Sequence, residues 1–500
     1  MTALAREASL DTDVAPLALA KLDPRRWWIL PVVLIGSFLS FLDFFIVTIA
    51  LPAMQADLGA HPSQLQFVVA AYGIGFGVFL ITGGRLGDIY GRKRVLLLGL
   101  AGFTVASTIC GLASSAVLLI AARVVQAICA AAVTPQVLAI IRVEFADGER
   151  AVAIGWYGAS MGFASIVAQL VGGFLISWNV FGWSWRLIFL INLPVGFLAI
   201  VLVWLLVRDS RNPRPATLDL GGVALASLAL FLLIYPTVEG REAGWPMWSF
   251  AMFLATVPVL VGFVLFERRV IAAGRTPLIA LHLLQIHSLR LGLAISIAFF
   301  STAGVFFVVL TMFFQNGLGF SASATGLMFL PFAIGFSASS ILSGQVANRI
   351  GPRTIIVGCL LMALSLFAII MVTLYSGAEP EAAVAATGLM VPVFLVYGLG
   401  QGLAQPTLIN TVVGASGVTG DDVGSAVGLF LTTAQSFVAF GVAAIGDVFF
   451  SFLSRSSGPG SYMTALIAAL TCNLILQVAC VLLACGLLRR AVHAGKHQAA

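Results

Sequence analysis

Fourteen long apolar stretches occupy most of this chain of 500 residues and limit what it can fold into. A helix needs about 20 mainly apolar residues to cross the hydrocarbon core of a bilayer. Only 9% of the residues are charged, whereas about a quarter are charged in a soluble domain, so a soluble globule is excluded. The sequence predicts an all-α polytopic membrane protein with transmembrane helices near residues 28–51, 65–85, 95–115, 117–140, 152–177, 187–207, 218–238, 247–266, 290–313, 323–346, 354–375, 388–412, 424–449 and 462–487.

The lysine and arginine residues indicate how these helices are oriented. Fourteen spans place both termini on one side, and with that side inside the cell, 22 of the 26 Lys and Arg residues lie in cytoplasmic segments. Because cytoplasmic loops are enriched in Lys and Arg, we expect a multi-pass protein of the cell (inner) membrane with cytoplasmic tails at 1–27 and 488–500. The net charge of +6 then reflects topology, and no basic, aromatic-interleaved patch predicts a nucleic-acid partner.

A short glycine-containing turn occurs twice in the chain. Gly84 and Gly91 in the first copy match Gly344 and Gly351 in the second, at a constant offset of 260 residues. Each copy lies between the second and third helix of a set of six. Two such sets around a central cavity form one class of secondary transporter.

This repeat predicts how the chain is divided. We expect an N-terminal six-helix bundle at 28–207, a C-terminal six-helix bundle at 276–487 and a two-helix insert at 208–275. Such a protein works in the lipid bilayer on a small-molecule substrate, and we expect it to act as a monomer.

Four stretches carry more specific patterns. Residues 42–52 read L-D-F-F-I-V-T-I-A-L-P, and residues 84–94 read G-R-L-G-D-I-Y-G-R-K-R. Residues 123–127 read R-V-V-Q-A, and residues 185–196 read W-R-L-I-F-L-I-N-L-P-V-G. They resemble the signatures L-D-x-T-I-V-N-V-A-L-P, G-x-L-A-D-R-x-G-R-K-x, R-x-x-Q-G and W-R-W-I-F-x-I-N-x-P-I-G of the major facilitator superfamily, and specifically of its fourteen-helix drug:proton antiporter branch. The resemblance covers nearly the whole chain and implies the major facilitator fold.

The fifth span departs from this branch. Where the branch has G-P-x-x-G-G, residues 168–173 read A-Q-L-V-G-G. Proline removes a backbone hydrogen bond and bends a helix, so we expect this helix to be straighter than the branch pattern implies.

Asp43 is the one carboxylate that the predicted spans place deep in the membrane, and Arg123 is the one deep cation. An intramembrane charge costs at least ~2.5 kcal/mol on insertion scales and marks a functional candidate. We predict that Asp43 exchanges protons for substrate and that Arg123, which cannot lose its charge, pairs with it and tunes it. The alternative for Asp43 is a purely structural carboxyl that is hydrogen-bonded to a neighbouring helix. The alternative for Arg123 is that it donates only to helix carbonyls and Gln126.

The turn after the second span is predicted to act as a conformational latch that opens when the bundles rock. Its residues are Gly84, Asp88, Gly91, Arg92, Lys93 and Arg94. In this hypothesis Asp88 accepts hydrogen bonds from a neighbouring helix end, whereas the second copy has Asn348 and should hold more weakly. The alternative is that the three basic residues only enforce topology.

Aromatic and amide side chains within the spans are the candidate substrate contacts. Aromatic rings attract organic cations, and a mostly apolar pocket with few polar groups suits lipophilic compounds. Tyr397, Gln401 and Gln405 are spaced four apart and share one helix face. The candidates are Phe44, Phe45, Tyr72, Gln126, Tyr157, Gln169, Gln315, Tyr397, Gln401 and Gln405.

Neither a metal site nor a cofactor site is predicted. The six cysteines lie in apolar runs without C-x-x-C spacing, and the five histidines lie in loops or tails without ligand spacing. A P-loop for ATP is missing from the sequence. We therefore expect a transporter and not an enzyme.

The function predicted from the sequence is proton-coupled export of lipophilic, cationic drugs or toxic compounds by alternating access. Two alternatives stay open: an exporter or facilitator of a specific metabolite or self-made antibiotic, and a non-transporting receptor or lipid-moving scaffold on the same fold.

Overall fold

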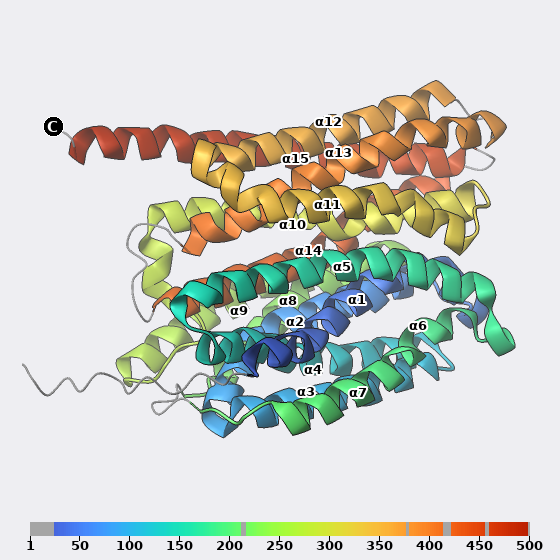
Figure 1. Ribbon diagram of the computed structural model, residues 1–500. Helices are drawn as coiled ribbons and strands as arrows, with labels where there is room; N and C mark the ends of the chain where they lie inside the picture. Colours follow the sequence, from blue (N-terminus) through green and yellow to red (C-terminus); the bar gives the residue numbers. More distant parts are fainter. Residues whose placement is uncertain (1–24, 212–216, 377–379, 414–421, 456–459, 499–500) are drawn as a thin grey trace, which may run out of the picture.

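The computed structural model describes residues 25–211, 217–376, 380–413, 422–455 and 460–498. Within these residues it contains fourteen helices that are long and apolar enough to cross a membrane. The helices lie side by side and run roughly along one direction (Figure 1), and the described residues contain no strand. The prediction of an all-α protein with fourteen spans is confirmed.

The first six spans form the N-terminal bundle. They are α1 (Arg26–Leu58), α2 (Pro62–Tyr90), α3 (Arg92–Gly111), α4 (Ala116–Glu144), α5 (Asp147–Trp178) and a sixth span made of η2 (Ser184–Arg186), α6 (Leu187–Leu190) and α7 (Asn192–Leu206). The sixth span is interrupted at Ile191. Pro194 explains the interruption, because it has no N–H to donate to the carbonyl of Leu190 four residues earlier.

The insert and the C-terminal bundle supply the other eight spans. The insert is α8 (Leu220–Glu242) and α9 (Met247–Ala272). The C-terminal bundle is α10 (His287–Met312), which ends in the π-turn η4 (Phe313–Gly317), α11 (Ala322–Ile350), α12 (Arg353–Ser376), α13 (Pro380–Val413), α14 (Asp422–Arg455) and α15 (Ser461–Gln498). Most helices are longer than the predicted apolar runs, and α15 continues into the segment 488–500 that was expected to be a tail.

The two bundles repeat one packing plan. In the N-terminal bundle α2 packs on α4, α1 on α5, α3 on α4 and α3 on α7. The same pairs recur as α11 on α13, α10 on α14, α12 on α13 and α12 on α15. The glycine repeat therefore reflects a repeat of helix packing.

Two helix pairs make the most extensive contacts between the bundles. α2 packs against α14, and α5 packs against α11. Between α5 and α11 the approach is close, because a Cβ on Gly173 would lie 2.6 Å from the carbonyl oxygen of Ala322. The insert lies against the first of these seams, where α8 contacts both α2 and α14.

The seam between α5 and α11 is closed at one end only. We call the end where α1 begins and α15 ends the terminal end, and the opposite end the distal end. Near the distal end Gln315 donates to the carbonyl of Ile49 at 2.9 Å, and Ser177 accepts from the Ser323 amide at 3.1 Å. Toward the terminal end both helices become exposed, at 154–156 in α5 and at 344–345 in α11, and a Cβ on Gly155 or Gly344 would meet nothing within 4 Å. The bundles thus meet at the distal end and separate along this seam toward the terminal end.

Helix α5 runs as one α-helix of 32 residues from Asp147 to Trp178 and contains no proline. That it is straighter than the branch pattern implies stays a prediction. The Gly-Pro pair whose absence was noted in the sequence would have interrupted its backbone hydrogen bonds where it now packs against α11.

Candidate functional site

An ion pair lies at the centre of the N-terminal bundle. Asp43 of α1 and Arg123 of α4 are both completely buried, and Arg123 Nη1 donates to Asp43 Oδ2. Arg123 also donates from Nε to the carbonyl of Val68 in α2 at 3.2 Å. Gln126, one turn after Arg123 on the same face of α4, accepts from Arg123 Nη1 and donates to Asp43 Oδ1, both at 2.8 Å.

Two further polar residues complete this network. Asn192 Nδ2 of α7 lies 3.2 Å from Asp43 Oδ1 and 2.9 Å from the hydroxyl of Ser107, which in turn donates to the carbonyl of Phe189 at 2.9 Å. Neither Asn192 nor Ser107 was predicted as a site residue. The available signal was Asn192 itself, an amide inside an apolar span and within the I-N-x-P stretch.

The environment of the pair makes its charges interdependent. Removing one partner of a buried pair leaves an uncompensated charge and costs about 3–5 kcal/mol. A carboxyl can take up a proton, but a guanidinium cannot lose one. Protonation of Asp43 would therefore leave Arg123 as a buried positive charge that has lost its counter-ion.

The ring of Tyr72 lies directly beside Arg123. The guanidinium carbon is 4.2 Å from the ring centroid, a distance typical of a cation–π contact. The Tyr72 hydroxyl donates to the carbonyl of Ser40 in α1 at 2.9 Å, which fixes the ring in place. The guanidinium lies against this ring, and Tyr72 also lines the central cavity.

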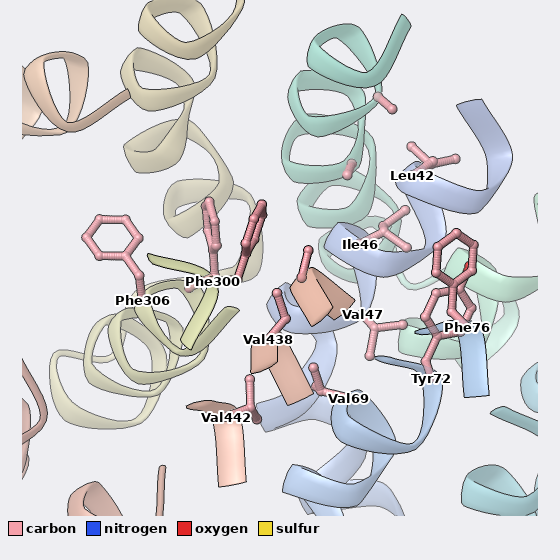
Figure 2. Packing of buried hydrophobic residues seen from close by; sticks show 14 of the residues in the cluster. Leu42, Ile46, Val47, Val69, Tyr72, Phe76, Phe300, Phe306, Val438 and Val442 are labelled. Atoms are coloured by element: carbon pink, nitrogen blue, oxygen red, sulfur yellow. The ribbon is translucent and has the colours of Figure 1, made fainter. Parts of the chain in front are cut away.

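The cavity lies between the two bundles, where about 770 Å³, part of it open to solvent, is not filled by protein atoms. Figure 2 shows Tyr72 and Phe76 on one side and Phe300 on the other, with Val438 of α14 between them. Its wall is mainly aromatic and, among the described residues that line it, contains no charged side chain. These residues are Ser40, Phe41, Phe44, Phe45, Tyr72, Phe76, Met161, Ser165, Phe300, Ala303, Phe332, Phe336, Gln401, Gln405, Gln435 and Val438.

Half of the predicted substrate contacts line this cavity. They are Phe44, Phe45, Tyr72, Gln401 and Gln405. The shared face predicted for α13 reaches the cavity with its two amides, whereas Tyr397 points into the C-terminal bundle and stacks on Phe306 at 4.1 Å.

The other predicted contacts lie elsewhere. Gln126 belongs to the Asp43 network, and Gln315 binds the Ile49 carbonyl at the distal end. Gln169 is buried where α5 meets α11, and its amide atoms have no hydrogen-bond partner among the described residues. Tyr157 of α5 is partly buried and packs against the main core.

The sequence repeat could have found two cavity residues that were missed. Phe332 and Phe336 follow Tyr72 and Phe76 by 260 residues, the same offset as the paired glycines, and all four line the cavity. Applying the offset to Tyr72 would have extended the predicted pocket into the C-terminal bundle.

The predicted latch turn is held inside the N-terminal bundle. Asp88 pairs with Arg92 of the same turn at 3.1 Å, Arg94 lies 3.5 Å from Asp209, and the Arg92 amide donates to the carbonyl of Ser210 at 2.9 Å. Lys93 donates to the carbonyl of Trp204 at 2.7 Å. In this conformation the turn contacts the end of α7 and the segment after it, and Asp88 accepts from Arg92, the first residue of α3. That this contact opens when the bundles rock stays a prediction.

The glycines of the turn have distinct structural roles. Gly91 adopts a φ of 104°, which favours glycine, and a Cβ there would lie 2.5 Å from Asp209 Oδ1. Gly84 is less constrained, with its nearest neighbour, Pro135 of α4, at 3.5 Å from a built Cβ.

Two further carboxylates are buried in the structure, both near the end of a span. Glu267 is completely buried because α9 continues to Ala272, beyond the predicted end at 266, and Asp219 at the start of α8 is 7% exposed. Among the described residues, no group of three or more His, Cys, Asp or Glu side chains is placed to hold a metal ion.

Comparison with protein families identifies the architecture. Residues 33–444 match the family model described as the Major Facilitator Superfamily. The chain belongs to this superfamily. It is therefore a membrane transporter by family and fold, and its fourteen helices place it with the fourteen-helix drug and antibiotic exporters of the superfamily.

Curated relatives align over most of the chain. A protein of Streptomyces coelicolor named "Probable actinorhodin transporter" is 36% identical over 87% of this chain and 74% of its own length. The puromycin resistance protein pur8 of Streptomyces alboniger is 35% identical over 85% of this chain and 82% of its own. The multidrug resistance protein Stp of Mycobacterium tuberculosis is 34% identical over 85% and 76%.

Solved structures share the fold at low sequence identity. A bacterial homologue of the human lysosomal transporter Spinster, in an inward-facing and unoccupied conformation, has a TM-score of 0.65 and 17% identity over 93% of this chain and 98% of that chain. A POT family transporter in complex with 5-aminolevulinic acid also has a TM-score of 0.65, with 14% identity over 92% and 96%.

Proposed function

We propose that this protein is a proton-coupled exporter of lipophilic, cationic drugs or toxic compounds that works by alternating access. The observation that carries the proposal is the buried Asp43–Arg123 pair, which contacts the aromatic cavity through the single ring of Tyr72. We place the protein in the cell (inner) membrane as a monomer, with the terminal end facing the cytoplasm because most Lys and Arg residues lie there.

Electrostatics can couple the proton to the substrate without direct contact. With Asp43 ionised, the pair is neutral, and a cation can bind the aromatic wall of the cavity. When Asp43 is protonated, the positive charge of Arg123 loses its counter-ion directly behind Tyr72. That charge repels a cation in the cavity, so proton and substrate exclude each other.

The arrangement of the seam supports export from the cytoplasmic side. The bundles meet at the distal end and separate between α5 and α11 toward the terminal end. This is the geometry of a conformation that accepts substrate from the cytoplasm or the inner leaflet. Release outside then requires the distal contacts to open.

A second candidate function is export of one specific antibiotic or other metabolite. It is favoured by the names of relatives, which include a tetracenomycin C resistance and export protein and a cephamycin export protein. The uncharged, aromatic wall of the cavity fits a neutral polycyclic compound as well as a cation.

Flux measurements in proteoliposomes separate these functions. A panel of fluorescent cations and neutral drugs is tested with and without an imposed pH gradient, using the wild type and Asp43→Asn. Proton-coupled export predicts gradient-dependent flux of several cations that the variant loses. Flux of one compound alone indicates the specific exporter, flux that ignores the gradient indicates a facilitator, and lack of flux indicates a non-transporting scaffold.

A further inference from the structure

The seam between the insert and α2 contains two buried carboxyl groups. Asp219 caps α8, where its Oδ1 accepts from the Gly222 amide at 2.8 Å and its Oδ2 from the Leu278 amide at 3.0 Å. Glu267 of α9 points to the same place. A Cβ on Gly222 would lie 2.5 Å from both Asp219 Oδ2 and Glu267 Oε1, so these oxygens are at most about 5 Å apart.

The surroundings of the two carboxyl groups are apolar. Val78, Val223 and Phe263 pack together around this seam. Among the described residues, the charged group that interacts with both acids is Arg85 of α2. Its guanidinium donates to the carbonyl of Thr217 at 3.0 Å and to the carbonyls of Thr276 and Pro277.

The hydrogen bonds distinguish the two acids. Both oxygens of Asp219 accept backbone N–H groups, from Gly222 and Leu278. The carboxyl oxygens of Glu267 are buried and form no well-shaped hydrogen bond among the described residues; their neighbours are the Asp219 side chain and the backbone amides of Leu278 and Ile279. If both acids were ionised, the seam would hold two negative charges and one positive charge, and a buried charge without a partner is normally neutralised.

We propose that Asp219 and Glu267 bind one proton between them, carried by Glu267 and directed at Asp219 Oδ2. This site is separate from the Asp43 network, since it lies on α8 and α9, and it binds a proton whether or not transport is proton-coupled. The bound proton keeps the seam neutral and so stabilises the contact of the insert with α2. Its loss adds a buried negative charge and loosens that contact.

Infrared spectroscopy of the purified full-length protein tests the site. Asp43→Asn removes the other candidate proton carrier and serves as the background. We expect a protonated-carboxyl C=O band at neutral pH that disappears when Glu267→Gln is added. The matched control is Glu242→Gln in the same insert, because Glu242 accepts from the amide and the hydroxyl of Ser63 at 2.9 and 2.8 Å, which favours a carboxylate; this change should leave the band intact.

Two results would overturn the proposal. One is the same band intensity with and without Glu267→Gln, which would mean that Glu267 is ionised. The other is loss of the band when sodium or potassium replaces choline in the buffer, which would make the pair a metal-cation site.

The wild-type protein gives a readout that needs no variant. The native state holds the proton, so raising the pH should remove the proton and lower the thermal unfolding midpoint while the band fades. A band that stays constant across the alkaline range, with an unchanged midpoint, would contradict a titrating pair.

Discussion

At the centre of the N-terminal bundle, Asp43 is bound by Arg123, Gln126 and Asn192. The equivalent position of the C-terminal bundle, 260 residues later, is the uncharged Ala303. There the corresponding core is neutral: Gln477 of α15 donates to Thr302 of α10 at 2.8 Å. Among the described residues, the buried charged side chains are Asp43, Arg123, Asp219 and Glu267. All four lie in the N-terminal bundle or the insert.

This difference separates two roles within one packing plan. Both bundles present aromatic rings to the cavity, and Tyr72 and Phe332 do so at equivalent positions of the repeat. Of these two rings, that of Tyr72 lies against the guanidinium of Arg123. The ring of Phe332 instead lies beside Tyr397, at a centroid distance of 6.0 Å. The N-terminal bundle can therefore sense protons next to the cavity, while the C-terminal bundle provides a binding wall whose charge is constant.

Removing the buried cation should give the largest effect on stability. We expect Arg123→Met to cost about 3–5 kcal/mol at alkaline pH, because Asp43 then stays charged without a partner. The cost should fall at acidic pH, where Asp43 can take up a proton. Thermal unfolding in detergent across pH measures both values.

The neutral core provides the matched control for this experiment. Gln477→Leu should cost about 1–3 kcal/mol through its lost hydrogen bond, with little dependence on pH. Equal pH dependence of Arg123→Met and Gln477→Leu would remove the distinction between the two bundles.

Asp43→Asn should abolish the response of transport to protons. The asparagine keeps the shape of the protonated acid but cannot titrate, so we expect pH-gradient-driven flux to fall at least tenfold, equivalent to about 1.4 kcal/mol. Binding of a neutral compound should survive, and a cation should bind more weakly because Arg123 keeps its charge. Gln477→Leu, in the neutral core of the C-terminal bundle, is the control and should keep gradient-driven flux.

The sequence predicted the fold more completely than the site. Apolar runs fix fourteen spans because length and hydropathy suffice in a bilayer. Asp43 and Arg123 were recognisable because an intramembrane charge must be paired. Gln126 and Gln169 were misplaced because the apolar pattern does not say which face of α4 or α5 meets the cavity.

The sequence pattern also could not predict which residues are buried at helix ends. Glu267 lies just after the predicted apolar run 247–266, but α9 continues past it to Ala272 and its carboxyl is buried beside the backbone of Leu278 and Ile279. The number and the order of the spans are local properties, whereas such a contact depends on how segments far apart in the chain pack together.

Substitutions of Tyr72 test whether the protonation of Asp43 affects cation binding through the ring of Tyr72. Tyr72→Leu removes the cation–π contact, worth about 2 kcal/mol when desolvated, and should weaken the pH dependence of cation binding several-fold. Tyr72→Phe keeps the ring and should retain most of it. Phe332→Leu is the control in the other bundle, where binding should weaken without any change in pH dependence, as measured by fluorescence titration.

Asp88→Asn should have a smaller effect. In the present conformation Asp88 pairs only within its own turn among the described contacts, so the variant should fold and bind substrate normally. If Asp88 forms a contact when the terminal end closes, its loss biases the protein toward the present conformation, and a bias of about 1 kcal/mol changes the populations roughly fivefold. Distances between spin labels on α5 and α11 measure that shift; Asn348→Ala, in the second copy of the turn, should shift them less.

The smallest expected effect concerns a surface contact of the N-terminal bundle. Arg26 of α1 binds Glu149 at the start of α5 through two bonds of 2.7 and 2.8 Å, whereas Ile286 stands 260 residues after Arg26. Hydrogen bonding from Arg26 lowers the pKa of Glu149. The native state therefore favours ionised Glu149, and the stabilisation is present above the ordinary carboxyl pKa and is lost as the pH falls through the lowered value. Thermal unfolding of Glu149→Gln should match the wild type in acid and lie slightly below it at neutral pH; a difference that persists in acid would show that the contact does not act through the charge of Glu149.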